Sequence, residues 1–185
     1  VLDLLRLTPE IPVGFYECPV PYKRVITPEL LGELVRSGRV KYHKDTCLDI
    51  NSVREKIKVT SSEAAFGLYD AYMAHAVESL QAGSAGLSCI QGNYFPELVV
   101  WLCDHYNEPG AEQQVTEVQS FFREHMDLMH ATYPASAKYV LHKRGLKIKQ
   151  SCRNGSMVTA DSVFKELDQL LEEADSLLAR LVNTV

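Results

Sequence analysis

The sequence predicts an α/β protein with a parallel sheet, followed by a purely helical region. Short apolar segments alternate with amphipathic helical segments over residues 1–106, and this alternation is typical of βα units. The connections between the segments are short, as such units require. After residue 107 only helical periodicity remains. We therefore expect two regions, a βα region at 1–106 and a helical region at 107–185.

Four βα units are expected in the first region. The predicted strands span residues 11–16, 39–44, 65–69 and 85–90. Helices are predicted at 1–7, 27–36, 49–57, 72–81 and 95–106. The helix near residue 27 has the clearest start, because Thr27 is a good N-cap and Pro28 suits the first helical position. This order predicts that neighbouring strands in the sequence are parallel neighbours in the sheet.

Three helices are expected in the second region. One long helix is predicted at 111–132, and a second at 134–144 ends at Gly145. The third begins near Thr159 and carries an apolar stripe at helical spacing. The residues of this stripe are Val163, Leu167, Leu170, Leu171, Leu177, Leu178 and Leu181.

Composition and charge exclude several classes of protein. The 185 residues are 46% hydrophobic and 23% charged, as in ordinary globular proteins, which excludes collagen-like and disordered chains. The formal net charge of -5 argues against nucleic acid as the main partner. No apolar run approaches the roughly 18 residues of a membrane span. The five cysteines form no C-x-x-C pair and no zinc-like cluster, so we expect free thiols, no metal and a cytoplasmic location.

Two residues at the carboxyl ends of predicted strands are candidates for chemistry, because reactive residues gather there in parallel sheets. Tyr16 ends the first strand and Lys44 ends the second. Alternation places Val40, Tyr42 and Lys44 on one face of their strand, and His43 on the other face. A desolvated lysine can form a Schiff base with a carbonyl, and a nearby phenol can move protons there. On spacing alone, however, such a lysine is more often a surface cation and such a tyrosine a packing residue.

Four segments in order carry a resemblance to one known family. They are 14–19 (GFYECP), 44–46 (KDT), 83–96 (GSAGLS with Asn93 and Pro96) and 134–145 (PASAK with Gly145). They resemble motifs of the dihydrodipicolinate synthase / N-acetylneuraminate lyase family, the first two being its tyrosine and Schiff-base lysine segments. The interval of 28 positions between Tyr16 and Lys44 is also that of the family.

The resemblance implies a (β/α)8 TIM barrel. The chain would contain strands five to eight with their helices, followed by the C-terminal helical region. Lys44 would form an imine with pyruvate or another 2-keto acid, and Tyr16 would shuttle protons, with no further cofactor and no metal. The substrate would also contact Thr46, Ala71, Ile90 and Asn93. The family implies a homo-oligomer, a dimer or a tetramer.

Some positions differ from the family. Pro21 stands where dihydrodipicolinate synthases usually carry an arginine for a second carboxylate, and Glu17 replaces a common asparagine. The acidic pair of sialic acid lyases is replaced by Met73 and Ala74. We therefore expect a class I carbon–carbon or carbon–oxygen lyase, an aldolase or dehydratase, that acts on some other 2-keto acid.

An alternative function stays open. The unusual Tyr16-Glu17-Cys18 segment and the missing arginine would also suit a catalytically inactive barrel relative that binds a ligand or serves in assembly. The Gly-rich carboxylate-binding loop of the family belongs to strands one to four, and from the order of the motifs we expect this sequence to begin in the fourth helix. The expected enzyme would therefore be complete only with the N-terminal half.

Overall fold

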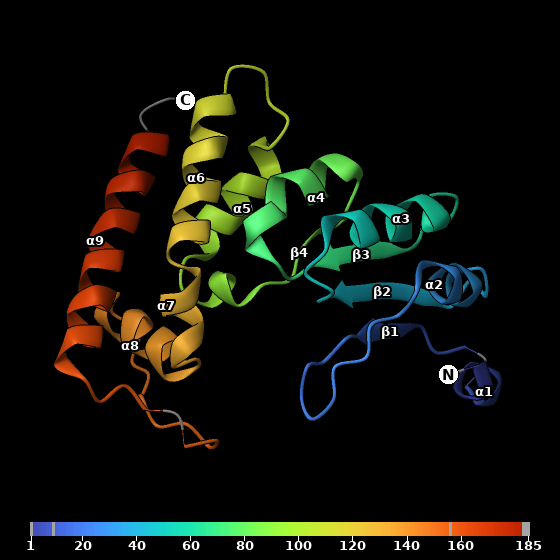
Figure 1. Ribbon diagram of the computed structural model, residues 1–185, viewed down its shortest axis with the longest axis horizontal. Coiled ribbons are helices and arrows are strands. Elements are labelled where there is room, and N and C mark those ends of the chain that lie inside the picture. Colours follow the sequence, from blue (N-terminus) through green and yellow to red (C-terminus); the bar gives the residue numbers. More distant parts are fainter. Residues whose placement is uncertain (1, 9, 156, 183–185) are drawn as a thin grey trace. The chain divides into compact units, whose positions relative to one another are not determined.

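The computed structural model describes residues 2–8, 10–155 and 157–182. The chain forms two compact units, Val1–Cys89 and Ile90–Val185 (Figure 1). Each unit has its own buried core. The predicted limit between a βα region and a helical region, at residues 106 and 107, remains a prediction.

The first unit is built on a parallel sheet of four strands. β1 (Val13–Tyr16), β2 (Val40–Asp45), β3 (Gly67–Asp70) and β4 (Gly86–Leu87) lie side by side in chain order. All three neighbouring pairs are parallel. The predicted α/β class and the predicted strand order are confirmed.

The helices of the first unit precede β1 or lie between successive strands. They are α1 (Leu2–Leu7), α2 (Pro28–Val35), α3 (Ile50–Thr60), the 3-10 turn η1 (Met73–His75) and α4 (Ala76–Ala82). Thr27 caps α2 as predicted, since its side chain accepts a hydrogen bond from the backbone N–H of Leu30 at 3.3 Å. Asp49 caps α3 in the same way. The helix predicted at 72–81 is wrong at its start, where the chain forms η1 before α4 begins.

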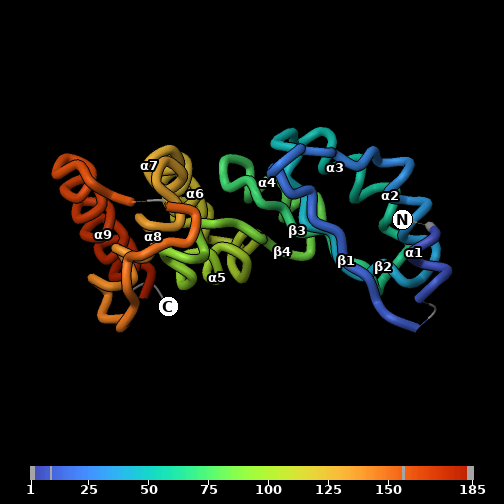
Figure 2. The backbone as a smooth tube through the Cα atoms, turned by 90° about the horizontal axis from the view of Figure 1, so that it is seen from below, coloured from blue at the N-terminus to red at the C-terminus, as the bar shows by residue number. Residues whose placement is uncertain are grey.

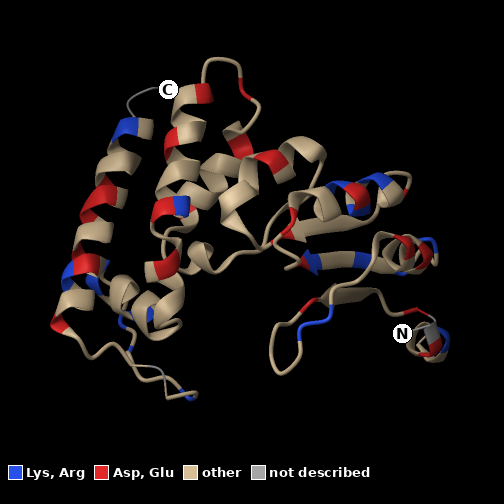
Figure 3. Ribbon diagram, viewed as in Figure 1, with Lys and Arg blue, Asp and Glu red and all other residues tan. Residues whose placement is uncertain are grey.

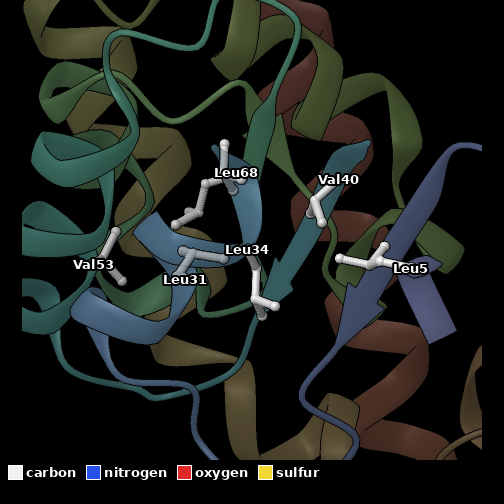
Figure 4. Close-up of a cluster of buried hydrophobic side chains, with 7 residues drawn as sticks. Leu5, Leu31, Leu34, Val40, Val53 and Leu68 are labelled. Atoms are coloured by element: carbon white, nitrogen blue, oxygen red, sulfur yellow. The ribbon is translucent and has the colours of Figure 1, made fainter. Parts of the chain in front are cut away.

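The core of the first unit lies between the sheet and its helices. α2 and α3 lie on the same side of the strands (Figure 2). Figure 4 shows the apolar side chains that meet there. They are Leu5, Leu31, Leu34, Val35, Val40, Val53 and Leu68. We call this side of the sheet the helix face and the other side the open face.

The strand register corrects one prediction about these faces. The pairing of β1 with β2 shifts after Val13, so Lys41 is an additional residue in β2. Such a bulge reverses the alternation of side chains along a strand. Val40 therefore packs into the core on the helix face, whereas Tyr42 and Lys44 lie on the open face. The prediction that all three share a face is wrong for Val40.

The second unit is helical. Its elements are η2 (Ile90–Asn93), α5 (Pro96–His105), α6 (Glu112–Glu124), α7 (Met126–Ala131), α8 (Ala135–Lys143) and α9 (Asp161–Val182). The single helix predicted at 111–132 is wrong, because the chain leaves helical geometry at His125 (φ −98°, ψ 9°) between α6 and α7. The predicted stripe of α9 is buried at Leu167, Leu170, Leu177 and Leu181.

The fourth strand is shorter than predicted. β4 contains only Gly86 and Leu87, and Ile90 belongs to the 3-10 helix η2 rather than to a strand end. Gly86 has a φ of 154°, which an L side chain rarely adopts.

Among the described helices, none combines the length and the apolar character that crossing a membrane requires.

Candidate functional site

The structure brings Tyr16 and Lys44 together at the ends of β1 and β2. The two residues are register partners in the parallel ladder. The Lys44 Nζ lies 4.5 Å from the centre of the Tyr16 ring. Tyr16 is 50% exposed and Lys44 is half-buried, so a small molecule can reach both side chains from the open face. The two candidates from different βα units therefore form one site, which we call the Tyr16–Lys44 pair.

Lys44 has an aromatic register partner in each neighbouring strand, Tyr16 in β1 and Tyr69 in β3. The Tyr42 and Tyr69 rings stack with their centres 4.9 Å apart. The Tyr42 hydroxyl donates a hydrogen bond to the Ser88 Oγ at 2.9 Å. Gly67 lies under the Tyr69 ring, where an added Cβ would come within 2.9 Å of that ring. This glycine therefore lets the Tyr69 ring lie close to the strand.

Thr46 and Ala71 follow β2 and β3 directly. Thr46 is buried, its backbone N–H donates to Glu17 Oε2 at 2.9 Å, and its hydroxyl donates to the Glu17 carbonyl at 2.6 Å. Ala71 is half-buried, and its N–H donates to the Asp45 carbonyl at 3.0 Å. The hydrogen bond from the Thr46 hydroxyl thus connects the end of β2 to the end of β1. A contact of Thr46 or Ala71 with substrate remains a prediction.

Ile90 and Asn93 belong to the second unit, where both lie in η2. The Asn93 side-chain amide is exposed and donates to the Ile90 carbonyl at 3.2 Å and to the Tyr133 hydroxyl at 3.1 Å. These bonds fix the amide within its own unit. A substrate-binding role for Ile90 and Asn93 remains a prediction.

Four charged or titratable side chains meet on the helix face behind the Tyr16–Lys44 pair. They are Glu17, His43, Asp45 and Lys56, which we call the buried tetrad. Each has an exposure of 2% or less. The Lys56 Nζ donates to Glu17 Oε1 at 2.8 Å and to Asp45 Oδ2 at 2.6 Å. Lysine is almost never fully buried unless it is paired, and here one ammonium joins two carboxylates.

His43 completes the buried tetrad at ion-pair distance. Its Nε2 lies 3.4 Å from Glu17 Oε1 and 3.7 Å from Asp45 Oδ2. Neither of its ring nitrogens has a hydrogen-bond partner among the residues that the structure describes. These contacts are therefore electrostatic, between a fully buried imidazole and two carboxylates.

In every member of the buried tetrad, the contacts with neighbouring residues shift the pKa more than burial does. Burial disfavours charge, but the contact with His43 and the hydrogen bond from Lys56 hold the pKa of the Glu17 carboxyl below its usual value. Burial is again outweighed at Asp45, whose pKa is held well below its usual value by His43, Cys47 and Lys56. The carboxylates in turn raise the pKa of Lys56 and of His43 against the effect of burial. With His43 protonated, two negative and two positive charges balance.

A metal ion does not fit the buried tetrad. Ligand atoms of Glu17, His43 and Asp45 lie within 4.8 Å of one another, which is close enough for a shared cation. The Lys56 ammonium, however, already lies against both carboxylates at hydrogen-bond distance. A second cation there would be repelled by the first. Lys56 therefore already occupies the position between the carboxylates that a metal ion would need.

The sequence pattern does not predict the buried tetrad. Strand alternation places His43 on the face opposite Lys44, as the structure shows, but it does not connect His43 to Glu17 or Lys56. One signal was available, because Lys56 lies on the buried stripe of α3 together with Val53 and Thr60. A lysine at such a position indicates a buried counter-charge. Figure 3 shows residues of both charge signs where β2 ends.

The fold and this site define an α/β protein of parallel βα units with a lysine and a tyrosine at neighbouring strand ends. The model of the Dihydrodipicolinate synthetase family matches residues 6–174. The chain therefore belongs to this family, which confirms the predicted resemblance. No curated protein matches the sequence.

Solved structures show the same fold. A monomeric dihydrodipicolinate synthase variant has a TM-score of 0.80 at 19% identity over 94% of this chain and 58% of its own. The Thermotoga maritima enzyme has a TM-score of 0.78 at 20% identity over 94% and 60%. A prophage protein of the family from Escherichia coli, in complex with pyruvate, has a TM-score of 0.78 at 18% identity over 94% and 61%.

The chain thus spans about three fifths of the length of these structures. The predicted fold class, a partial (β/α)8 barrel with a C-terminal helical region, is confirmed. At these identities the similarity concerns the fold, and the chemistry has to be argued from the residues of this chain.

Proposed function

We propose that this chain supplies the imine-forming lysine and the proton-transferring tyrosine of a class I lyase for pyruvate or another 2-keto acid. The observation that carries the proposal is the Tyr16–Lys44 pair, register partners with the amine 4.5 Å from the phenol ring. Family membership supports it. Two similar structures, from Escherichia coli and Acinetobacter baumannii, are complexes with pyruvate.

The proposed chemistry needs only these two side chains at the reacting carbon. The neutral Lys44 amine attacks the keto carbon, and the resulting carbinolamine loses water to give an imine. The protonated imine withdraws electrons, so a bond at the adjacent carbon can form or break. The Tyr16 phenol gives a proton to the departing hydroxyl and takes one back in the reverse step. No external cofactor enters this sequence.

The remaining parts of the proposed site define the kind of substrate. Thr46, Ala71, Ile90 and Asn93 are the proposed substrate contacts. Pro21 offers no charge for a second carboxylate, so we propose an aldolase or a dehydratase of a 2-keto acid other than that of dihydrodipicolinate synthases. Since the chain spans about three fifths of its structural relatives, the rest of the site is proposed to come from the remaining part of a full-length, cytoplasmic homo-oligomer.

Borohydride trapping tests the proposal. The full-length protein is mixed with pyruvate and sodium borohydride, and the intact mass and the modified peptide are measured. We expect one reduced adduct on Lys44 and none in Lys44→Ala. Lys41→Ala is the matched control, because Lys41 lies on the same strand with an exposed side chain, and it should trap like the wild type.

Two outcomes would overturn this assignment. The first is a wild-type protein without an adduct, and the second is an adduct that persists in Lys44→Ala. An adduct without turnover of any 2-keto-3-deoxy sugar acid in a panel would instead favour the alternative, a catalytically inactive relative that binds a ligand.

A further inference from the structure

Two members of the buried tetrad are sequence neighbours of the Tyr16–Lys44 pair. Glu17 follows Tyr16 directly, and Asp45 follows Lys44 directly. Because successive side chains of a strand point to opposite faces, each carboxylate lies behind one member of the pair. The Lys56 Nζ bonds both carboxylates, at 2.8 Å and 2.6 Å. One ammonium therefore connects the two strand ends from the helix face.

Glu17 makes further bonds that connect three segments. Its Oε1 also accepts a hydrogen bond from the Ile26 N–H at 2.9 Å, which holds the loop between β1 and α2. Its Oε2 accepts from the Thr46 N–H at 2.9 Å. The Thr46 hydroxyl returns a bond to the Glu17 carbonyl at 2.6 Å. The ends of β1 and β2 and the following loop thus share one buried carboxylate.

We propose that the buried tetrad is a positioning network, in which Lys56 and Glu17 set the relative placement of Tyr16 and Lys44 from the opposite face of the sheet. This inference rests on the proposed function, since it assigns the network to the same reacting pair. The residues act through the backbone of the strand ends and do not touch the substrate.

Electrostatic repulsion explains why the network controls the distance between the ends of β1 and β2. Without the ammonium, the Glu17 and Asp45 carboxylates would have only His43, at 3.4 Å and 3.7 Å, to offset their repulsion in a region shielded from water, where like charges repel strongly. The repulsion would separate the ends of β1 and β2. A displacement of about 1 Å at reacting groups lowers a rate by about 100-fold. The pair that depends on this spacing is Tyr16 and Lys44.

The test compares variants of the full-length protein by two measurements. Imine formation with pyruvate is followed by timed borohydride quenching and intact mass. Backbone amide exchange is followed by mass spectrometry over residues 16–26 and 44–47. The variants are Lys56→Met, Lys56→Arg and Glu17→Gln. The control is Val53→Ala, which weakens the packing of the same helix without touching the buried tetrad.

In Lys56→Met we expect imine formation about 10- to 100-fold slower per folded molecule, with faster amide exchange confined to the two segments. Lys56→Arg should recover much of the rate, because a guanidinium can also bond two carboxylates. If Lys56→Met does not fold, Glu17→Gln serves instead, since it keeps an oxygen acceptor but removes the charge. Val53→Ala should keep the wild-type rate per folded molecule.

The outcomes separate this inference from the proposed function. If the wild type traps pyruvate on Lys44 and folded Lys56→Met or Glu17→Gln traps it at the same rate, the positioning role alone is overturned. Equal slowing in Val53→Ala would also overturn it, because the effect would then be general loss of stability. Wild-type protein that traps nothing would overturn the proposed function, and unchanged amide exchange in the variants would still count against the network.

Discussion

The two faces of strands β1 and β2 differ sharply although they share one backbone. On the open face, Tyr16 is half exposed, Lys44 is half-buried, and the aromatic rings around them stack. On the helix face, the buried tetrad is nearly inaccessible to water, and its lysine lies within hydrogen-bond distance of two carboxylates. Both faces carry a lysine at the same end of the sheet, but in opposite surroundings.

This difference shows how one sheet can serve two purposes. A reacting group needs access for its substrate. A structural charge needs permanent partners, because a buried charge without them is costly. Lys44 meets the first requirement and Lys56 meets the second. The comparison can be tested by treating equivalent side chains on the two faces in the same way.

The largest expected effect on stability comes from the two lysines. Lys56→Met should lower the free energy of unfolding by about 3–5 kcal/mol, because it leaves two buried carboxylates with only the His43 imidazole to balance their charge. Lys44→Met should cost about 1 kcal/mol or less, since it removes a partly exposed cation beside an aromatic ring. Urea unfolding of the full-length variants measures both. Equal losses would remove the distinction between the two faces.

The next effect concerns the reaction rather than stability. Tyr16→Phe should slow imine formation from pyruvate about 100-fold, or about 2.7 kcal/mol, because the phenol proton is lost. Its free energy of unfolding should change by about 1 kcal/mol or less, since Tyr16 is half exposed. Tyr42→Phe is the matched control on the same face. A trapping rate near wild type in Tyr16→Phe would remove the proton-transfer role.

Much of the fold could be predicted because it depends on local signals. The cap at Thr27 and the alternation of apolar strands with helices lie within short segments. Two features depend on more distant contacts. The face of Val40 follows from the register shift between β1 and β2, which no pattern within one strand reveals. The break at His125 divides a segment whose apolar spacing alone predicts continuous helix.

The candidate site shows the same difference between local signals and distant contacts. Tyr16 and Lys44 were found because a family motif marks each of them, and the parallel register then brings them together. The buried tetrad has no such motif. Glu17 and Lys56 are separated by 39 positions in the chain, and their pairing arises only when α3 packs on the sheet. Sequence could have indicated only that Lys56 occupies a buried position and needs a partner.

A smaller effect concerns pH and His43. Glu17 from β1, Asp45 from β2 and Lys56 from α3 face this imidazole, and the carboxylates raise its pKa above 6.5 although burial opposes this. Its contribution to stability is therefore complete below pH 6.5 and is lost as the pH rises through the raised value. Burial raises the pKa of the neighbouring Cys47 to about 11, so that thiol titrates at higher pH.

Denaturant unfolding from pH 6 upward measures this dependence, with His43→Leu for comparison. The wild type should lose stability relative to the variant as the pH rises, because only the wild type releases this proton. The other titrating groups are common to both proteins and cancel in the difference. Parallel pH curves would mean that the pKa of His43 is the same in the folded and unfolded protein, and a relative gain in wild-type stability would mean that folded His43 is neutral. Either result would show that the charge balance of the buried tetrad is wrong.

The smallest effect expected is that of a hydrogen bond on the open face. Tyr42 donates to the Ser88 Oγ at 2.9 Å in a half-buried position. Tyr42→Phe should lower the free energy of unfolding by about 1 kcal/mol, the usual net value of one neutral hydrogen bond, because water can reach the serine that loses its partner. The ring stack with Tyr69 is kept in this variant. A loss as large as that of Lys56→Met would mean that the open face, too, depends on buried polar contacts, and the contrast between the faces would then be one of chemistry and no longer one of stability.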